Sequence, residues 1–399
     1  MIESSNSESL PSSPVDPAPD FHRLHVAAKA LVGLSDFGEP SYHEGMNVLL
    51  HSYDNNPNQL PECRTRCEGN IIGALVGRLL SEAAWKSHPQ VLQLPIKAPI
   101  IITGLPRTGT TALHKLLAVD PQFQGLELWL GNSPTPRPPR SEWASRPDFI
   151  ATKGFLEDLY ARLPQMRAIH EIFADLPEED WTLLTQDFAG LMLMENAHVP
   201  EFETWVEHEF RADTAYRRFA NNLRLIGSND PHRRWVIKDP IHLMFMESVL
   251  DNFPDATIIQ THRNPVRSIP SMCSLVWLLR GYFENPDNDP KLIGKRQLAQ
   301  WSMALDRTRK VRNARPQRFL DVSCSRIADD PIAVVNQIYD FCGLRLEPGV
   351  EKSMRAWIEN NKKGKHGEHR YDLETFGLAE SEIANTFAEY LADYELARD

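Results

Sequence analysis

The chain has 399 residues, and its 54 acidic side chains outnumber its 43 basic ones, for a formal net charge of −11. This balance argues against a protein that coats nucleic acid, because such proteins usually carry net positive charge. With 42% apolar and 24% charged residues the chain can build a sizeable core, and no apolar run approaches the roughly 20 residues needed to span a bilayer.

Residues 1–20 are rich in Ser, Pro and Asp and are predicted to form a disordered tail, since they offer little apolar surface to offset their ordering entropy. They lack the cationic start and apolar stretch of a secretory signal, which predicts a cytoplasmic protein. The five cysteines are few and odd in number, as expected of free thiols in a reducing compartment. Cys63 and Cys67 have no second ligand pair, so no metal is predicted.

Residues 21–95 follow a helical pattern, in which Val76, Leu79, Leu80 and Ala83 recur at three- and four-residue spacing. This segment is predicted to be a helical N-terminal extension that packs on the core. The core itself is expected to comprise residues 96–399, where strand-like and helix-like patterns alternate.

Four short apolar runs are predicted to be buried strands: Pro99–Thr103, Trp235–Lys238, Ala256–His262 and Arg318–Ser323. A fifth strand is predicted near Gly125–Leu130. Alternation of strands with helices implies an α/β fold of three layers, with a central parallel sheet flanked by helices. One such helix is expected to open at Asp330-Pro331, a cap followed by a first-turn proline. The proline-rich block Gly131–Pro147 is predicted to be a long surface loop.

The first predicted strand runs into a glycine-rich turn, Gly104-Leu-Pro-Arg-Thr-Gly-Thr-Thr111, that precedes a helix. Such a turn exposes backbone N–H groups at a helix N-terminus, where an anion is favoured. The spacing matches a Walker A loop, except that Thr110 stands in the position of the lysine and Arg107 supplies the cation. The missing lysine argues against ordinary ATP or GTP hydrolysis. The alternative interpretation is a glycine-rich turn without a ligand.

This turn resembles the phosphosulfate loop of the sulfotransferase family, whose members use 3′-phosphoadenosine 5′-phosphosulfate (PAPS). The match to the family's Pro-(Lys/Arg)-(Ser/Thr)-Gly-Thr-Thr loop consists of Pro106, Arg107, Thr108, Gly109, Thr110 and Thr111. The form Gly-Leu-Pro-Arg-Thr-Gly-Thr-Thr is similar to that of a bacterial branch of the family. The resemblance extends over about residues 21–391. It implies a P-loop-type fold and a PAPS-binding domain over residues 96–399.

A second motif, Thr261-His-Arg-Asn-Pro-Val-Arg-Ser-Ile-Pro-Ser271, follows the third predicted strand. The family binds the 3′-phosphate of PAPS with an arginine at a strand end and a serine eight residues later, and Arg263 and Ser271 have this spacing. Taken alone, Arg263 equally suits a surface salt bridge. Together with the first loop it indicates a phosphate clamp, since an arginine fork and a hydroxyl near a helix N-terminus suit that anion.

A third, weaker resemblance lies in the basic segment Lys362–Gly367, which is similar to the family's Lys-Gly-x-x-Gly loop that closes over the nucleotide. It implies that Lys363 and Gly364 contact the 3′-phosphate. A charge run of this kind is equally typical of a solvated loop.

Sulfuryl transfer from PAPS is an in-line displacement by a hydroxyl or amine, and cationic side chains with helix amides can stabilise it without a metal. Arg107 is expected to stabilise the leaving phosphate. His170, in a stretch resembling one of the bacterial branch, is the first candidate for the general base, although it also suits a packed core histidine. Glu127 is the second, because some family members use a glutamate. Lys238 ends a predicted strand and is expected near the transferred group.

The sequence therefore predicts a PAPS-dependent sulfotransferase that acts on a small-molecule acceptor. The alternatives are a P-loop small-molecule kinase, supported by Asp239 as a Walker B acid and opposed by Thr110, and a catalytically inactive nucleotide-binding module. Apolar residues over Phe149–Phe210 and Trp277–Phe283 suggest a partly hydrophobic acceptor pocket, although such stripes are also typical of a core. The acceptor's identity and any homo-oligomer stay open.

Overall fold

The structure, a computed structural model, describes residues 17–361 and 372–396. Its centre is a five-stranded sheet in the order β2-β3-β1-β4-β5, in which all neighbouring strands are parallel. The strands are β1 (Ile100–Gly104), β2 (Phe123–Gln124), β3 (Arg234–Lys238), β4 (Thr257–His262) and β5 (Phe319–Ser323). Since all of them run in one direction, their carboxyl ends meet at one edge of the sheet.

Three helices precede the sheet: α1 (Asp20–Val32), α2 (His43–Asp54) and α3 (Pro61–Ser87). The helices between β1 and β3 are α4 (Thr110–Leu117), α5 (Leu128–Asn132), α6 (Pro147–Arg162), α7 (Met166–Ile169), α8 (Trp181–Leu184), α9 (Leu191–Glu195), α10 (Pro200–His208) and α11 (Ala212–Ile226). The remaining helices are α12 (Met246–Asn252), α13 (Pro265–Phe283), α14 (Pro290–Ala314), α15 (Cys324–Asp329), α16 (Pro331–Phe341), α17 (Pro348–Asn360), α18 (Glu380–Thr386) and α19 (Ala388–Asp393).

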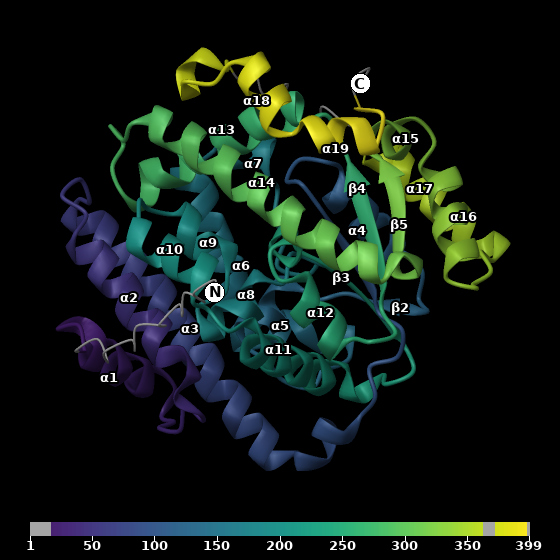
Figure 1. The fold of residues 1–399 in the computed structure, drawn as a ribbon. Coiled ribbons are helices and arrows are strands. Elements are labelled where there is room, and N and C mark those ends of the chain that lie inside the picture. Colours follow the sequence, from purple (N-terminus) through teal and green to yellow (C-terminus); the bar gives the residue numbers. More distant parts are fainter. Residues whose placement is uncertain (1–16, 362–371, 397–399) are drawn as a thin grey trace, which may run out of the picture.

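The sheet is buried on both faces by helices. Successive side chains of a strand point to opposite faces, so one strand contributes to two cores. Ile100 and Ile102 of β1 pack into a core shared with α4, α16 and α17. Ile101 packs into a second, larger core shared with α11, α12 and α14. Figure 1 shows the N-terminal helices α1–α3 on the side of the molecule away from α16 and α17. The predicted three-layer α/β fold with a helical N-terminal layer is confirmed.

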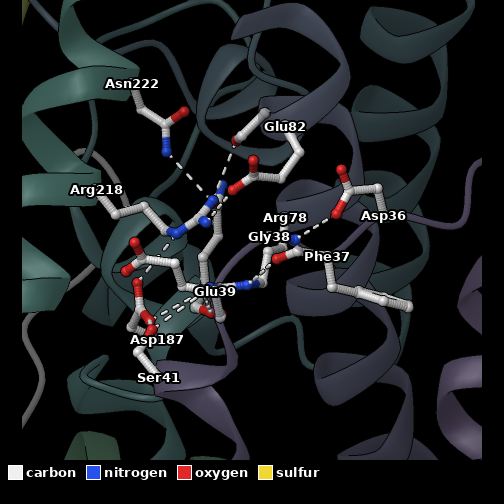
Figure 2. A network of polar contacts seen from close by, with 12 residues as sticks. Asp36, Phe37, Gly38, Glu39, Ser41, Arg78, Glu82, Asp187, Arg218 and Asn222 are labelled. Carbon is white, nitrogen blue, oxygen red and sulfur yellow. Dashed lines mark hydrogen bonds and ion pairs between the residues drawn. The ribbon is translucent and has the colours of Figure 1, made fainter. Parts of the chain in front are cut away.

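A buried network of charges ties the N-terminal layer to the rest of the protein (Figure 2). Arg78 of α3 pairs with Asp187 at 2.8 Å and donates to the carbonyl oxygen of Phe37 at 2.6 Å. Arg218 of α11 lies 3.3 Å from the same aspartate and also pairs with Glu82 of α3. Because an unpaired buried charge is strongly unfavourable, these residues hold α3 and α11 in one arrangement.

The fifth strand is present, but it lies just before the predicted range Gly125–Leu130. Strand β2 covers only Phe123 and Gln124, and the apolar residues that follow belong to α5, which begins at Leu128. Glu127 is therefore the N-cap residue of a helix. A short apolar run has no periodicity that separates a buried strand from a buried helical turn, which explains the error.

Two further local predictions can be compared with the structure. Asp330 caps α16 as expected, since its Oδ1 accepts from the N–H of Ala333 at 3.0 Å. The proline-rich block 131–147 is more ordered than the surface loop that was predicted. It contains a 3₁₀ helix, Arg140–Ser145, and buries Trp143 against Trp129. Prolines prevent long helices and ladders but leave room for a single 3₁₀ turn.

None of the five cysteines, all of which lie in the described residues, forms a disulfide. Cys67, on α3, donates from Sγ to the carbonyl oxygen of Phe283 at 3.2 Å and serves in packing. Within the described residues, no helix is both long and apolar enough to span a bilayer.

Candidate active site

The loop between β1 and α4 has a backbone shape that its two glycines permit. Gly104 has φ 151°, and a Cβ at this position would lie 2.4 Å from Thr261 Oγ1. Gly109 is the N-cap residue of α4, with φ 90°. Arg107 also has a positive φ, 68°, which is uncommon for a residue with a side chain and is typical of functional sites. The loop thereby presents the N-terminus of α4 to a cavity.

The predicted phosphosulfate-loop residues divide into two groups. Pro106, Arg107, Gly109, Thr110 and Thr111 line the cavity. The hydroxyl of Thr108 instead donates to the carbonyl oxygen of Leu105 and contacts Thr261 Oγ1, both at 2.6 Å. The side chain of Thr108 therefore fixes the loop to β4.

The second predicted motif meets the first directly. Arg107 donates from Nε to Ser271 Oγ at 3.2 Å, and Arg263 donates from Nη1 to the carbonyl oxygen of Arg107 at 3.0 Å. Asn264 caps α13, because its side chain accepts from the N–H of Val266 at 3.0 Å. The ends of β1 and β4 are neighbours, with Gly104 opposite Thr261. This adjacency brings together residues that lie 156 positions apart in the chain.

These elements surround a cavity of about 960 Å³, near the upper end of the usual range for small-molecule sites. At the sheet edge its wall includes Arg107, Arg263 and Arg267. The rest of the wall is mostly apolar and includes residues of α3, α5, α6, α8, α9 and α13. The cavity thus joins a cationic end to an apolar body.

Lys238 is fully buried at the end of β3, behind the cavity wall. Its Nζ lies 2.6 Å from Glu179 Oε1, 3.8 Å from Glu178 Oε1 and 3.3 Å from Thr111 Oγ1. Burial opposes the charge of Lys238, but the carboxylates of Glu179 and Glu178 raise its pKa above the ordinary value. The lysine is therefore a cation that contacts the phosphosulfate loop through Thr111.

His170 follows α7 and lines the cavity. Its Nε2 lies 3.3 Å from Oε1 of the buried Glu178. Burial alone would raise the pKa of Glu178, but His170, Lys238 and Lys115 together lower it below its ordinary value. Glu178 is thus a carboxylate placed to accept a hydrogen from Nε2 of His170, and an imidazole that is neutral with its hydrogen on Nε2 carries a lone pair on Nδ1.

One cluster of potential metal-ligand atoms is found in the described ranges, and it consists of His170, Glu178 and Glu179. Each residue offers one such atom, and the three atoms lie within 4.8 Å of one another. The ammonium group of Lys238 contacts both carboxylates. It supplies one positive charge beside these two carboxylates.

Glu127, the second candidate base, is occupied elsewhere. Its Oε2 accepts from Nη2 of the buried Arg137 at 2.9 Å and from Nε of the same arginine at 3.1 Å. Glu127 is not among the residues that line the cavity. The arrangement assigns Glu127 to holding the proline-rich block 131–147 against the sheet.

Several residues that line the cavity were not predicted as site residues from the sequence. Arg267 lies in the first turn of α13, and Cys324 and Ser325 open α15 beside the predicted phosphosulfate loop. A signal for the latter pair existed, since they follow the last predicted strand and therefore lie at the carboxyl edge of the sheet. Lys363 and Gly364 lie outside the described residues.

The chain has clear similarity to known proteins. A sequence model of the sulfotransferase family matches residues 99–348. The fold is similar to the crystal structure of sulfotransferase STF1 from Mycobacterium tuberculosis, with a TM-score of 0.84, 35% identity and coverage of 92% of this chain and 98% of that one. It is also similar to sulfotransferase STF9 from Mycobacterium avium, with a TM-score of 0.86, 27% identity and coverage of 96% and 98%.

A curated relative extends this comparison. The omega-hydroxy-beta-dihydromenaquinone-9 sulfotransferase Stf3 from Mycobacterium bovis is 25% identical over 263 residues, which are 62% of this chain. The aligned part spans 63% of the length of that relative.

Proposed function

The chain belongs to the sulfotransferase family, and we propose that it transfers a sulfuryl group from PAPS to a hydroxyl or amine of a small-molecule acceptor, releasing adenosine 3′,5′-bisphosphate. One observation carries the choice of donor: Arg107 and Arg263 line the cationic end of the cavity, and Arg107 contacts both Arg263 and Ser271, although Ser271 is not itself among the lining residues. PAPS carries anionic groups at both its 5′ and 3′ positions, and two adjoining cationic motifs suit such a nucleotide.

We assign the 5′-phosphosulfate to the loop before α4. The backbone N–H groups at the α4 N-terminus, with Thr110 and Thr111, would bind its oxygens, and Arg107 would stabilise charge on the leaving phosphate. Arg263 and Ser271 would bind the 3′-phosphate. We propose that Lys363 and Gly364 join them.

In the proposed reaction, the acceptor oxygen forms a bond to sulfur while the bond from sulfur to the bridging phosphate oxygen breaks, and the electron pair of that bond leaves with the phosphate. The acceptor proton would pass to Nδ1 of His170, which the Nε2 contact with Glu178 leaves available. Lys238 would act through Thr111, close to the transferred group. The cationic groups and the helix amides stabilise the charge that develops, so we propose that no metal is required.

The apolar body of the cavity supports an acceptor that is itself partly hydrophobic. The name of the Mycobacterium bovis relative specifies a menaquinone-derived alcohol, which belongs to the same broad chemical class. The five cysteines form no disulfide with one another, which fits a reducing compartment, and we propose that the protein acts in the cytoplasm.

Calorimetry can test the donor. Adenosine 3′,5′-bisphosphate should bind without Mg²⁺, and ATP with Mg²⁺ should bind much more weakly. Tight binding of ATP with Mg²⁺ would instead support the kinase alternative, which Asp239 favours. Asp239 lines the cavity, and its Oδ1 accepts from the N–H of Ile241 at 3.0 Å while its Oδ2 has no hydrogen-bond partner among the described residues. Release of adenosine 3′,5′-bisphosphate from PAPS with a phenol acceptor, in the presence of EDTA, would separate an enzyme from an inactive nucleotide-binding module.

A further inference from the structure

The cavity is elongated along α13. Met272, Leu275, Leu279 and Phe283 of this helix all line it, at spacings of three and four residues that place them on one face. Arg267, near the start of α13, lines the cationic end of the same cavity. At a rise of about 1.5 Å per residue, the wall from Arg267 to Phe283 is roughly 24 Å long. Such a cavity suits a long molecule better than a compact one.

Helix α3 contributes glycines to the cavity wall. Gly69, Gly73 and Gly77 recur every fourth residue and all line the cavity. A Cβ at Gly69 or Gly73 would meet no atom within 4 Å, so neither packing nor backbone shape requires a glycine there. Glycine lowers the stability of a helix interior relative to alanine. The absent side chains leave open space in the cavity.

Asn196 supplies an independent sign of a ligand at this end. It follows α9, is only 1% exposed and lines the same cavity. Neither its Oδ1 nor its Nδ2 has a hydrogen-bond partner among the described residues. Buried amides nearly always have such partners, so this side chain is suited to bind a polar group of a ligand.

The glycines and Asn196 lie at the far end of α13 from the phosphate motifs. Close to Asn196 in the chain, His198 donates from its backbone N–H to the carboxylate of Glu284, the C-cap residue of α13, at 3.1 Å. The N-terminal half of α3 reaches the same end through the hydrogen bond from Cys67 to Phe283. A molecule that reacts beside His170 could therefore extend between α3 and α13 toward Asn196.

We infer that Gly69, Gly73 and Asn196 select the acceptor: an elongated, largely apolar molecule with its reacting hydroxyl at one end and a hydrogen-bonding oxygen toward the other. The inference rests on the proposed function, because the sulfotransferase reaction fixes which end of the molecule reacts.

The apolar part can be tested with 4-alkylphenols, from methyl to nonyl, titrated into protein saturated with adenosine 3′,5′-bisphosphate. For the unmodified protein the Kd should fall about fourfold per added methylene, the value expected for burying apolar surface. Gly73→Leu should abolish this gain for the longer chains. Gly154→Leu is the matched control, because Gly154 lies within helix α6 with open space at its Cβ and does not line the cavity.

Two results would overturn this part of the inference: no chain-length dependence in the unmodified protein, or the same dependence in Gly73→Leu. If adenosine 3′,5′-bisphosphate does not bind, the proposed donor site fails instead. The alkylphenol series is then run on the protein alone. There the comparison of Gly73→Leu with Gly154→Leu still tests whether the space beside Gly73 holds the alkyl chain.

Asn196 requires a second probe pair, a 4-(ω-hydroxyalkyl)phenol and the 4-alkylphenol of equal length. The Asn196→Leu variant should lose about tenfold of the unmodified protein's preference for the hydroxylated ligand, the scale of one unsatisfied buried hydrogen bond. Affinity for adenosine 3′,5′-bisphosphate and the thermal midpoint report on folding. An unchanged preference in a folded variant would show that Asn196 does not contact the ligand.

Discussion

Arg107 and Ser271 are joined by a hydrogen bond of 3.2 Å from Nε to Oγ, although they lie 164 residues apart. Arg107 follows β1 and Ser271 lies in the second turn of α13, which follows β4. The pairing of β1 with β4 brings the two together. A nucleotide bound here would contact both motifs at once. Because we assign a different phosphate group to each motif, substitutions in the two motifs should affect the binding of different groups.

Replacing Arg107 should affect the chemical step most. Arg107→Ala should lower kcat about 100-fold or more, the scale of losing a charged donor worth roughly 3 kcal/mol in the transition state. Arg107→Lys keeps the charge and loses the planar fork, so it should be intermediate. Steady-state kinetics with PAPS would measure both, and a normal kcat for the alanine variant would contradict the role given to Arg107.

Replacing Arg263 should affect recognition of the 3′-phosphate. Arg263→Gln should weaken adenosine 3′,5′-bisphosphate by about 2 kcal/mol or more, because a charge-assisted fork is lost. Adenosine 5′-phosphate is the control ligand. Arg263 also donates to the Arg107 carbonyl, so a loosened loop would weaken both nucleotides. Equal losses in calorimetry would therefore show that Arg263 acts on the loop rather than on the 3′ position.

The charge network that holds the N-terminal layer predicts a large effect on stability. Arg78 is fully buried, and Arg78→Ala would leave Asp187 with one cationic partner fewer and free three backbone carbonyls, those of Phe37, Glu39 and Gln186. We expect a loss of about 3–5 kcal/mol in the free energy of unfolding, measured by urea denaturation.

The matched control for Arg78 is Arg309→Ala. Arg309 pairs with Glu389 on the surface, where the side chains are 42% and 72% exposed, and such pairs contribute less than about 1 kcal/mol. Similar losses in the two variants would show that the buried network does not anchor α3.

A buried histidine predicts how stability depends on pH. His114 of α4 is fully buried and hydrogen-bonds through Nε2 to the carbonyl oxygen of Val236 at 3.0 Å. Burial, aided by the charge of Lys238, lowers the pKa of His114 to about 3. The unfolded chain takes up a proton near pH ~6.5 while the folded protein does not. Stability is therefore present above that pH and is lost as the pH falls toward the folded-state value.

Between pH 7 and pH 5 the protonation of His114 in the unfolded chain should lower the free energy of unfolding by about 2 kcal/mol, since each pKa unit corresponds to about 1.4 kcal/mol. His114→Gln keeps a donor group and cannot titrate, so its free energy of unfolding should fall less over this interval. Urea denaturation at the two pH values would measure the difference. Parallel losses in both proteins would assign the pH dependence to other groups.

The parts of the site that sequence predicts well are those fixed by local geometry. Gly104 and Gly109 mark a strand, a tight turn and a helix N-terminus in continuous sequence, so the loop can be placed without knowing its neighbours. Arg263 and Ser271 are predicted instead from their resemblance to the family's spacing, and only the helix start at Asn264-Pro265 follows from local geometry. Their mutual contact depends on strand order, which the alternation of elements indicates only in outline.

Other features depend on contacts that no local pattern specifies. The pairing of Lys238 with Glu179 follows from how residues 170–180 fold back over the end of β3. The pairing of Glu127 with Arg137 has no local signal for the same reason, since Arg137 lies in the proline-rich block predicted as a surface loop. The open space beside Gly69 and Gly73 cannot be seen from α3 alone, because it depends on the distance to neighbouring helices.

The choice of general base can be decided with three variants. His170→Ala should lose most of kcat while the affinity for adenosine 3′,5′-bisphosphate stays unchanged, because His170 lies outside both phosphate motifs of the sequence. Glu178→Gln should also lower kcat, since a carboxamide no longer holds the Nε2 hydrogen as a carboxylate does and Nδ1 is then less reliably free to accept a proton.

Glu127→Gln is the decisive comparison, because Glu127 is the second candidate base predicted from the sequence and its carboxylate lies outside the cavity wall. It should keep a near-normal kcat and lose stability, since Arg137 would lose its charged partner. An inactive Glu127→Gln beside an active His170→Ala would reverse the assignment. Full activity in all three would mean that the acceptor ionises without help from the protein, as an acidic phenol does, and would rule out His170 as the base for that acceptor.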